Sequence, residues 1–429
     1  MKKKYRIILY TSIFLLCVVA SIILVVKKSN SVYEEESKPK VVTHKRMLSM
    51  NLEQTAGAGD YKTVTQSKWP TEGYKFNAEL SRCENGSTLS WDDTKKAVIV
   101  SGNLSDKCYV YFDIYQPTLA EYIKSQYTGT QGENNIYYHD SDLANGAGDN
   151  SYRYAGANPN NFVCFGSDTS PCPTDNLYRI IGVFGENYHG VIGKQLVKLI
   201  KYDYMTTDEL GTDGDYSQTY KEWGMDNTYK GTYGDGERIG VYYWNYKATG
   251  SATNTWSTSL LNKTNLNTNF INNIGTTWAN KIATVTWKVG GNTWANIGTK
   301  TSSVAYTNEI TNPVTTNTTD NATTYSAKIG LMYVSDYGFA ASPDAWTLTM
   351  SSYNNTTATN NNWMYMGLYE WTISRYADHS NFAFSVFRDG NVYDYYVGNG
   401  IGVRASFNLE SSVSYVSGSG SMSDPIVIN

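Results

Sequence analysis

The feature that most restricts this chain is a run of 20 residues without a charge, from Ile7 to Val26. It is long enough to cross the hydrocarbon core of a bilayer as a helix. Four basic residues between Lys2 and Arg6 precede it, a bias that places the amino terminus in the cytoplasm. A cleaved signal peptide is the alternative, although its apolar core would be shorter. We therefore predict a single-pass cell-membrane protein, with a cytoplasmic tip and anchor over residues 1–28 and the bulk of the chain extracellular.

The cysteines agree with an extracellular location. Cys17 lies in the apolar run, and the other four fall into two close pairs, Cys83 with Cys108 and Cys164 with Cys172. An even number of cysteines outside a membrane favours disulfides. Four cysteines allow three pairings, of which we predict the local one.

Composition limits the class of protein. Only 17% of the residues are charged, the formal net charge is −4, and lysine and arginine are scattered beyond the amino terminus. We therefore expect no nucleic-acid partner. The 37 tyrosines can supply a core, so the chain is not disordered. Its length suits two or three domains.

The first 116 residues predict a stalk and a small module. Residues 29–66 are charged and punctuated by proline and glycine, with a short helix expected from Lys45 to Gln54. Short runs of β-forming residues then alternate with turn residues, which predicts an all-β module over residues 67–115 tied by a disulfide. In the run from Lys107 to Asp113, alternation puts Cys108, Val110 and Phe112 on one face. The module is either a spacer or an adhesion domain.

Residues 117–429 predict one larger domain. Thr118 and Glu121 have capping-box spacing at the start of a helix. Residues 177–184 and 195–202 are expected to be paired strands, and a helical pattern begins at Trp256. A buried strand is expected over residues 328–333, followed by a turn at Asp336-Tyr337-Gly338.

Residues 375–401 are the candidate ligand-binding stretch. They lie between an aromatic segment and Gly402-Val403-Arg404, and they mix tyrosine, asparagine, serine and glycine, as binding loops do. Five apolar residues are predicted to face the core: Ala383, Phe384, Val386, Val392 and Val397. The predicted ligand contacts are Arg375, Tyr376, Asp378, His379, Asn381, Phe387, Arg388, Asp389, Tyr393, Asp394, Tyr395, Tyr396 and Asn399.

Four segments of the larger domain carry a resemblance to a known family. They are WSTSLLNKTNLNTNF, KIGLMYVSDYG, WTISR and GVRASFNL, and Ala405 stands where the family usually has proline. Their order resembles an uncharacterised family of Gram-positive bacterial surface proteins over about residues 117–429. The closing Gly-Val-Arg and the late tryptophan also resemble the C-type-lectin-like fold of formylglycine-generating enzymes and phage receptor-binding proteins.

That resemblance implies a C-type-lectin-like domain with an antiparallel sheet and short helices. Together with the predicted transmembrane helix and small all-β module, this gives an α+β fold. Residues 177–184 and 195–202 would join the strands near Trp371 and Arg404 in one antiparallel system, with Arg404 structural and bound to loop carbonyls or a carboxylate. The copper-binding cysteines of a formylglycine-generating enzyme and the calcium-binding sugar motifs of lectins are absent.

The restricted set of residue types in residues 375–401 suggests that this part of the gene is diversified by targeted mutation. The stretch has no Lys, Glu, Gln, Trp or Met, and every residue in it can be encoded by an asparagine codon, AAC, with its two adenines changed. Diversity-generating retroelements leave that footprint and usually target the lectin-like fold. A tyrosine-rich loop that reached this alphabet by chance is the alternative.

We expect neither catalysis nor a cofactor. Asp140, Asp142 and Asn145 have no EF-hand spacing and suit a solvated turn, so no metal site is predicted. Only His379 lies among ionisable residues of the candidate surface, near Arg375, Asp378 and Asp389, which is weak support for a general base. The predicted function is binding of a surface protein or glycan. Two alternatives are a structural cell-envelope protein without a specific ligand and a surface enzyme.

Overall fold

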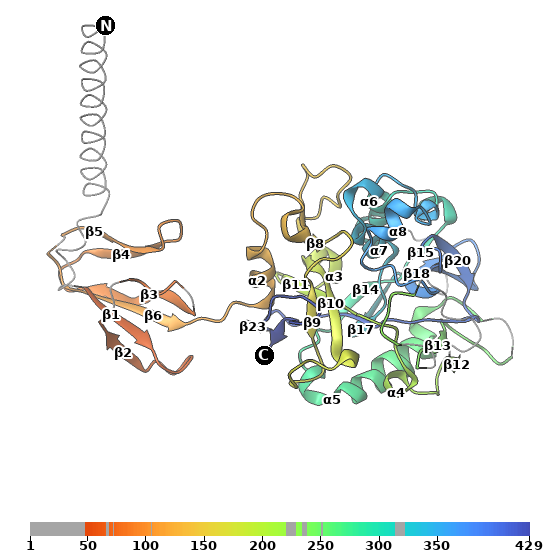
Figure 1. Ribbon diagram of the computed structural model, residues 1–429, viewed down its shortest axis with the longest axis horizontal. Coiled ribbons are helices and arrows are strands. Elements are labelled where there is room, and N and C mark those ends of the chain that lie inside the picture. Colours follow the sequence, from red (N-terminus) through yellow and green to blue (C-terminus); the bar gives the residue numbers. More distant parts are fainter. Residues whose placement is uncertain are drawn as a thin grey trace, which may run out of the picture. The chain divides into compact units, whose positions relative to one another are not determined.

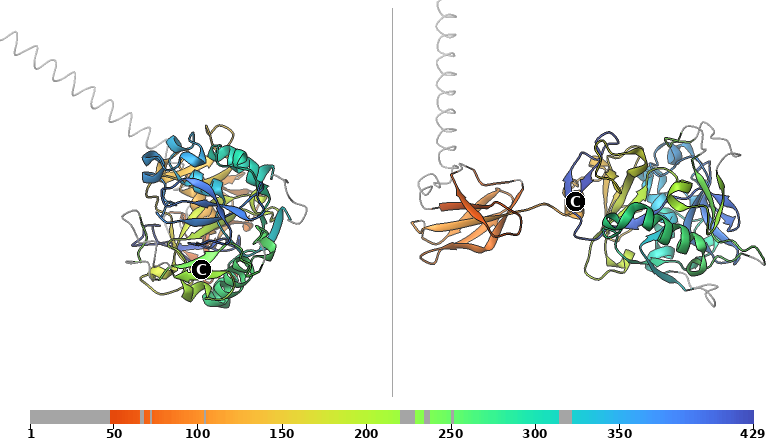
Figure 2. Two further views of the ribbon diagram at one scale, coloured as in Figure 1. Left: turned by 90° about the vertical axis from the view of Figure 1, so that its right-hand side faces the viewer. Right: turned by 90° about the horizontal axis from the view of Figure 1, so that it is seen from below.

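The structure is a computed structural model, and it describes residues 48–65, 68–71, 73–103, 105–219, 229–233, 238–249, 252–313 and 322–429. The chain divides into two compact units, Met1–Gln116 and Pro117–Asn429, called unit 1 and unit 2 below. Figures 1 and 2 show the elements of each unit from three directions.

Unit 1 contains a four-stranded sheet and a two-stranded hairpin. The sheet order is β2-β1-β6-β3, in which β1 and β6 run parallel and the other neighbours antiparallel. Its strands are β1 (Leu48–Glu53), β2 (Tyr61–Val64), β3 (Tyr74–Cys83) and β6 (Cys108–Ile114). The hairpin consists of β4 (Thr88–Asp92) and β5 (Ala97–Ser101).

The core of unit 1 is built around Phe112, which is fully buried. The rings of Trp69, Phe76 and Trp91 surround it at centroid distances of 5.7 to 5.9 Å. Cys108 and Val110 are buried on the same strand, which confirms the face predicted from alternation along β6.

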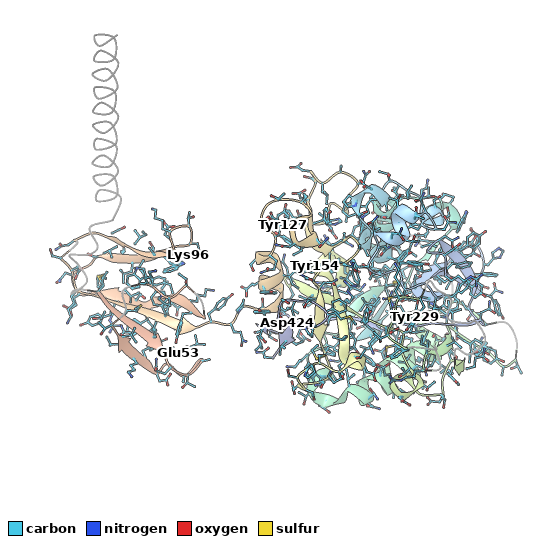
Figure 3. All side chains as sticks on the ribbon, viewed as in Figure 1. Glu53, Lys96, Tyr127, Tyr154, Tyr229 and Asp424 are labelled. Atoms are coloured by element: carbon cyan, nitrogen blue, oxygen red, sulfur yellow. A yellow bond between two sulfur atoms is a disulfide. The ribbon has the colours of Figure 1, made fainter. Side chains whose placement is uncertain are left out.

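The amino-terminal part of unit 1 corrects the predicted stalk and the start of the module at residue 67. Residues 48–53 form β1, so the helix expected from Lys45 to Gln54 is a strand where the structure describes it. Glu53, labelled in Figure 3, is buried at the end of β1, and its carboxylate accepts hydrogen bonds from the N–H groups of Gly59 (3.1 Å) and Ile114 (2.9 Å). Sheet pairing and this carboxylate tie a polar segment into the module.

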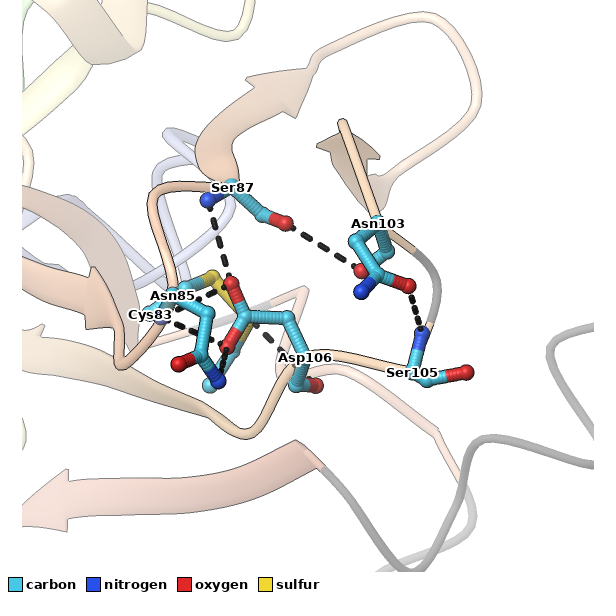
Figure 4. The surroundings of a disulfide bond; sticks show 7 residues. Cys83, Asn85, Ser87, Asn103, Ser105 and Asp106 are labelled. Atoms are coloured by element: carbon cyan, nitrogen blue, oxygen red, sulfur yellow. Dashed lines mark hydrogen bonds between the residues drawn. A yellow bond between two sulfur atoms is a disulfide. The ribbon is translucent and has the colours of Figure 1, made fainter.

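Both predicted disulfides are confirmed, Cys83–Cys108 and Cys164–Cys172. The first joins the end of β3 to the start of β6. Beside it, the Asp106 carboxylate accepts hydrogen bonds from the backbone N–H groups of Asn85 (2.9 Å) and Ser87 (3.1 Å), as Figure 4 shows. Desolvation acts against ionisation, but these hydrogen bonds outweigh it and lower the pKa of Asp106. The loop is therefore fixed by an ionised carboxylate as well as by the bridge.

Replacing Cys83 and Cys108 together by alanine is expected to destabilise unit 1 by about 3 kcal/mol, because the bridge closes a loop with a sequence separation of 25. Hydrogen exchange of the amides in β3 and β6 measures the loss. The matched control replaces Cys164 and Cys172, whose separation is 8 and whose loss should be smaller and confined to unit 2. Unchanged exchange in β3 and β6 of the first variant would contradict the prediction.

Unit 2 is organised around a seven-stranded sheet. Its order is β17-β22-β11-β10-β8-β7, with β9 also paired to β10. The two central strands are buried along their whole length, because both faces of the sheet are covered. The strands are β7 (Ile136–His139), β8 (Ser151–Tyr154), β9 (Phe162–Cys164), β10 (Leu177–Phe184), β11 (Leu196–Lys201), β17 (Ile329–Gly330) and β22 (Ser406–Asn408). The strand pair predicted at residues 177–184 and 195–202 is thus confirmed.

Smaller sheets complete unit 2. One sheet consists of β12 (Tyr216–Thr219), β13 (Gly240–Tyr243) and β21 (Gly400–Ile401), and a second of β15 (Gly291–Asn292), β18 (Glu370–Tyr376), β19 (Phe382–Val386) and β20 (Val392–Tyr396). Two further sheets are strand pairs: β14 (Val285–Lys288) with β16 (Thr324–Ala327), and β23 (Tyr415–Ser417) with β24 (Val427–Ile428). The predicted single antiparallel system is correct for β22, which pairs with β11. It is wrong for the strand of Trp371, because β18 belongs to a separate sheet.

The helices of unit 2 are short; in Figure 1, α6 and α8 lie at the top of the unit and α4 and α5 at the bottom. The α-helices are α2 (Leu119–Ser125), α3 (Glu186–His189), α4 (Thr207–Leu210), α5 (Ile271–Ala279), α6 (Ser302–Tyr306), α7 (Val334–Ala340) and α8 (Thr356–Asn360). The 3-10 helices are η2 (Glu133–Asn135), η3 (Thr174–Asn176), η4 (Trp256–Thr258), η6 (Trp294–Asn296), η8 (Pro343–Ala345) and η9 (Met350–Ser352), and two π-helices are η5 (Leu261–Phe270) and η7 (Thr307–Thr311).

The local sequence patterns predicted some of these helices correctly and others incorrectly. The capping box of α2 is confirmed, since Thr118 Oγ1 accepts the N–H of Glu121 and the Glu121 carboxylate accepts the N–H of Thr118. The helix predicted from Trp256 forms in pieces, η4, η5 and α5, and Gly275 has a φ of 75° inside the last. The turn expected at Asp336 lies within α7 instead.

The predicted α+β fold class is corrected by the balance of elements. Strands make up 34% of the structure and helices 21%, so the chain consists mainly of sheets. Asparagine, threonine and glycine interrupt the apolar patterns that predicted longer helices, because these residues favour caps and turns over helix interiors.

The membrane prediction is corrected as well. Residues 7–26, the predicted span, lie outside the described residues. In the part of the chain that the structure does describe, no helix combines the length and the apolar composition needed to cross a bilayer.

Candidate ligand-binding surface

The candidate stretch contains the end of β18, the strand β19 and the edge strand β20 of the sheet β15-β18-β19-β20, at the right of unit 2 in Figure 1. β19 pairs antiparallel with β18 and with β20, and the short β15 lies parallel to β18. Side chains alternate along a strand. Tyr393 and Tyr395 of β20 therefore lie on one face of the sheet, and Asp394 and Tyr396 lie on the other.

The five residues predicted to face the core are all confirmed as buried, at most 2% exposed: Ala383, Phe384, Val386, Val392 and Val397. The turn between β19 and β20 depends on Gly390, which has a φ of 95°. A Cβ there would lie 2.6 Å from Thr359 Cγ2 and 2.9 Å from the carbonyl oxygen of Tyr353. Both the left-handed backbone and the close approach require glycine. The scaffold beneath the exposed residues is therefore rigid.

Two predicted ligand contacts are inside the protein. Arg375 is 1% exposed and Tyr376 is 8% exposed, because β18 is a central strand between β15 and β19. Gly291 of β15 packs against the Arg375 guanidinium, which a Cβ on that glycine would approach to 2.7 Å. Burial lowers the pKa of Arg375 to about 10. The assignment of these two residues to the binding surface is corrected: they pack within the sheet.

A second set of predicted residues lies at the β18–β19 turn and along the adjacent face of β20. Asp378 and His379 are exposed, and Asn381, Asp394 and Tyr396 are half-buried. Burial raises the pKa of Asp394, and nearby Asp378 adds to this, whereas its own backbone N–H and His379 act in the opposite direction. These residues form a mixed polar rim.

The ionisable residues considered for catalysis do not gather at one place. His379 lies in the turn before β19, whereas Asp389 lies in the turn after it, at the other end of the strand. Arg375 is buried between strands. Of the four residues considered, only Asp378 remains beside His379. The arrangement therefore gives the enzyme alternative no assembled acid–base set.

On the opposite face, five aromatic side chains form what we call the aromatic patch: Trp294, Tyr369, Phe387, Tyr393 and Tyr395. Ring centroids are 4.4 Å apart for Trp294 and Tyr393 and 4.8 Å apart for Tyr369 and Phe387. Tyr393 is 45% exposed and the other four are half-buried. This is a contiguous, partly open aromatic surface at the edge strand of the sheet.

The polar residues around the aromatic patch come from the neighbouring turns. Arg388 and Asp389 are exposed in the β19–β20 turn, where the Asp389 carboxylate accepts the N–H of Asn391 at 3.2 Å. Asn399 lies close enough to hydrogen-bond with Tyr395. Of the predicted contacts, the patch thus brings together Phe387, Arg388, Asp389, Tyr393, Tyr395 and Asn399.

The rings of the aromatic patch do not share a plane. Trp294 is tilted by 53° to Tyr393, Phe387 by 55° to Tyr393, and Phe387 by 77° to Tyr395, whereas Tyr369 and Tyr395 are stacked at 21°. Of these pairs only Phe387 and Tyr395 pack edge to face. The surface that they present has relief and is not a flat platform.

Sequence reasoning missed two members of the aromatic patch. Trp294 comes from η6 and Tyr369 immediately precedes β18, so both lie outside residues 375–401. For Trp294 the available signal was a tryptophan in a polar segment, Asn292-Thr293-Trp294-Ala295-Asn296.

No family model, no curated protein and no solved structure matches this chain. Its resemblance to the Gram-positive surface-protein family stays a prediction.

Proposed function

We propose that unit 2 is a recognition domain that binds a protein partner through the aromatic patch. The observation that carries this proposal is the group of five adjoining, partly exposed aromatic rings with Arg388 and Asp389 at their border. Tyrosine, tryptophan and arginine dominate the energetics of protein interfaces, since they supply large contact area at low entropic cost. Two disulfides suit the oxidising compartments in which surface recognition takes place.

The relief of the patch favours a protein over a glycan partner. A row of sugar rings stacks best on aromatic rings that lie in one plane. Here only Tyr369 and Tyr395 are nearly parallel, at 21°, and the other neighbouring pairs of the patch are tilted by 53° to 77°. Side chains of a folded partner can fill the spaces between tilted rings, and the opposite charges of Arg388 and Asp389 can set its orientation. The buried residues beneath hold the surface in its binding shape before contact.

The two other functions that we considered make different predictions. A structural cell-envelope protein would have no partner whose affinity depends on the patch. A surface enzyme would need ionisable groups near its substrate, and Arg375 and Asp389 are not placed beside His379.

Alanine at Tyr393 or at Tyr395 is expected to weaken partner binding at least tenfold, about 1.4 kcal/mol, because each truncation removes an aromatic contact at the centre of the patch. An array of secreted and cell-surface proteins, probed with the labelled full chain, identifies candidate partners, and titration measures each variant. Tyr138→Ala is the matched control, since Tyr138 is also half-buried but lies on β7 of the other sheet. A partner that binds all three variants equally, or a glycan that requires Tyr393, would contradict the proposal.

Diversification of residues 375–401 remains a hypothesis, motivated by their restricted alphabet, and the structure makes its test sharper. Related copies of the gene should differ at exposed positions such as Arg388, Asp389 and Tyr393. They should be constant at Phe384 and Val392, which are fully buried. Sequencing such copies decides the matter. Differences spread evenly over the gene, or as frequent at the buried positions as at the exposed ones, would end the hypothesis.

A further inference from the structure

A pocket of about 400 Å³ lies in unit 2 and shares no residue with the aromatic patch. Tyr122 and Gln126 contribute to it from α2 and its end, Asn134 and Asn135 from η2, and Tyr154 from β8. Its volume falls within the range of small-molecule sites, roughly 300–1,000 Å³. Two exposed loop residues complete the rim, Asn160 and Ser419.

The buried phenol of Tyr154 is the most informative group in this pocket. Tyr154, labelled in Figure 3, is 4% exposed, and burial raises its pKa above the ordinary value. Its hydroxyl makes no hydrogen bond to any residue that the structure describes. The oxygen is not one of the fully buried unpaired atoms, so it is accessible from the pocket that Tyr154 lines. There it is a donor and acceptor that can bind water or a ligand.

Further polar groups of the pocket are available in the same way. Within the described ranges, the carboxamides of Asn135 and Asn160 make no hydrogen bond. A carboxamide both donates and accepts, and so does a hydroxyl. The vicinal hydroxyls of a sugar need partners of this kind, because each of them also donates and accepts.

The charge of the pocket restricts the ligand further. All of its lining residues are uncharged near neutral pH. The pKa of Tyr122 is raised to about 12 by burial, with Tyr415 and Asp424 adding to the effect, so its phenol stays protonated. An ionised ligand group would lose its hydration here without a counter-charge, which is costly.

Tyr122, which also lines the pocket, is held in place by a neighbouring ring. It is stacked on Tyr415 with centroids 3.7 Å apart and planes within 5° of parallel. Its side chain is therefore a fixed part of the pocket wall.

We propose that this pocket binds one neutral sugar ring, with Tyr154, Asn135 and Asn160 bound to its hydroxyls. The site is separate from the proposed protein-binding function. A free monosaccharide and the terminal residue of a glycan both present such a neutral ring with vicinal hydroxyls.

Saturation-transfer NMR with the full chain tests the proposal. The probes are glucose, galactose, mannose and N-acetylglucosamine, with glucuronic acid and glucosamine as charged analogues, and methyl glycosides and short oligosaccharides separate a free sugar from a glycan end. At least one neutral probe should bind more tightly than about 10 mM. Tyr154→Phe and Asn160→Ala should each weaken that binding at least tenfold.

Two control variants make the outcome decisive. Tyr138→Phe removes a hydroxyl that donates to Asn150 outside the pocket, and Tyr393→Ala disrupts the aromatic patch, so neither should change sugar affinity. Asn160 is exposed, so Asn160→Ala keeps the test valid if Tyr154→Phe misfolds. The proposal is overturned if no neutral probe binds, if the charged analogues bind as tightly, or if both pocket variants retain full affinity.

Discussion

Replacing Asp336 by alanine is expected to lower the free energy of unfolding of unit 2 by about 3–5 kcal/mol, because it leaves a buried ammonium group without its carboxylate. The Asp336 carboxylate accepts hydrogen bonds from Lys198 Nζ (2.6 Å), the Tyr188 hydroxyl (2.6 Å) and the backbone N–H of Tyr333 (3.0 Å). The side chains of Lys198 and Asp336 are both fully buried.

The surroundings of this ion pair explain why the loss should be large. Arg153, buried in the same region, already has its own carboxylate, Asp149, at 2.8 Å, and its guanidinium lies 3.8 Å from Asp336. Burial lowers the pKa of Lys198, and Asp336 is the main group that opposes this. Without Asp336 the pKa of Lys198 should fall further. The unfolded variant would then bind more protons than the folded variant. The loss of stability caused by Asp336→Ala should therefore shrink as the pH rises toward the ordinary pKa of lysine.

Urea unfolding measures the effect, and a double variant provides the matched control. Lys198→Met combined with Asp336→Leu removes both charges and refills the space, so it should be much more stable than Asp336→Ala alone. A loss below about 1 kcal/mol in the single variant, the range of exposed pairs, would contradict the prediction. A double variant as unstable as the single one would show that packing, and not the stranded charge, decides the loss.

What the sequence predicted correctly rests on local signals. The strand pair β10–β11, the capping box at Thr118 and the local cysteine pairs each depend on residues a short distance apart. Alternation and apolar spacing likewise identified the buried residues of β19 and β20. Each of these patterns involves residues no more than 25 positions apart, and local propensity and burial agree there.

What the sequence missed depends on partners far away in the chain. Lys198 and Asp336 are separated by 138 residues, and each looks like an ordinary surface residue in its own segment. Arg375 was expected to be exposed, but the two-residue strand β15 covers that side of β18. Trp294 and Tyr369 join the aromatic patch only because the sheet brings η6 and the start of β18 together. A single sequence carries no signal for such pairings.

Arg404→Met is expected to cost unit 2 about 3–5 kcal/mol near neutral pH, because it leaves the Glu370 carboxylate buried without its counter-ion. Arg404 donates from Nε to Glu370 Oε1 at 2.8 Å and from one terminal nitrogen to Oε2 at 2.9 Å. The same nitrogen donates to the carbonyl oxygen of Met364 at 2.7 Å. This confirms the structural role predicted for Arg404. The two parallel hydrogen bonds of the guanidinium join Glu370, at the start of β18, to the Gly402-Val403-Arg404 turn. A lysine at position 404 could not form this paired contact.

The pH dependence of that loss identifies its cause. Burial raises the pKa of Glu370, and Arg404 is the main group that opposes this. In Arg404→Met the folded-state pKa should rise further above the unfolded value, so the folded protein binds the extra proton. The stability that this extra proton contributes is complete below the pKa that Glu370 has in the unfolded chain. It is lost as the pH rises through the pKa that Glu370 has in the folded protein. The difference between variant and wild type should therefore shrink on acidification from pH 7 toward about pH 4.5.

An exposed ion pair in the same unit provides the control. Arg238 lies 2.7 Å from Asp175, but the two side chains are 53% and 44% exposed. Arg238→Met should therefore cost less than about 1 kcal/mol and show little change of that cost with pH. Urea unfolding of both variants across the pH range measures the two curves side by side. If the cost of Arg404→Met stayed constant or grew on acidification, the buried Glu370 charge would not be its source, and lost side-chain packing would account for it instead.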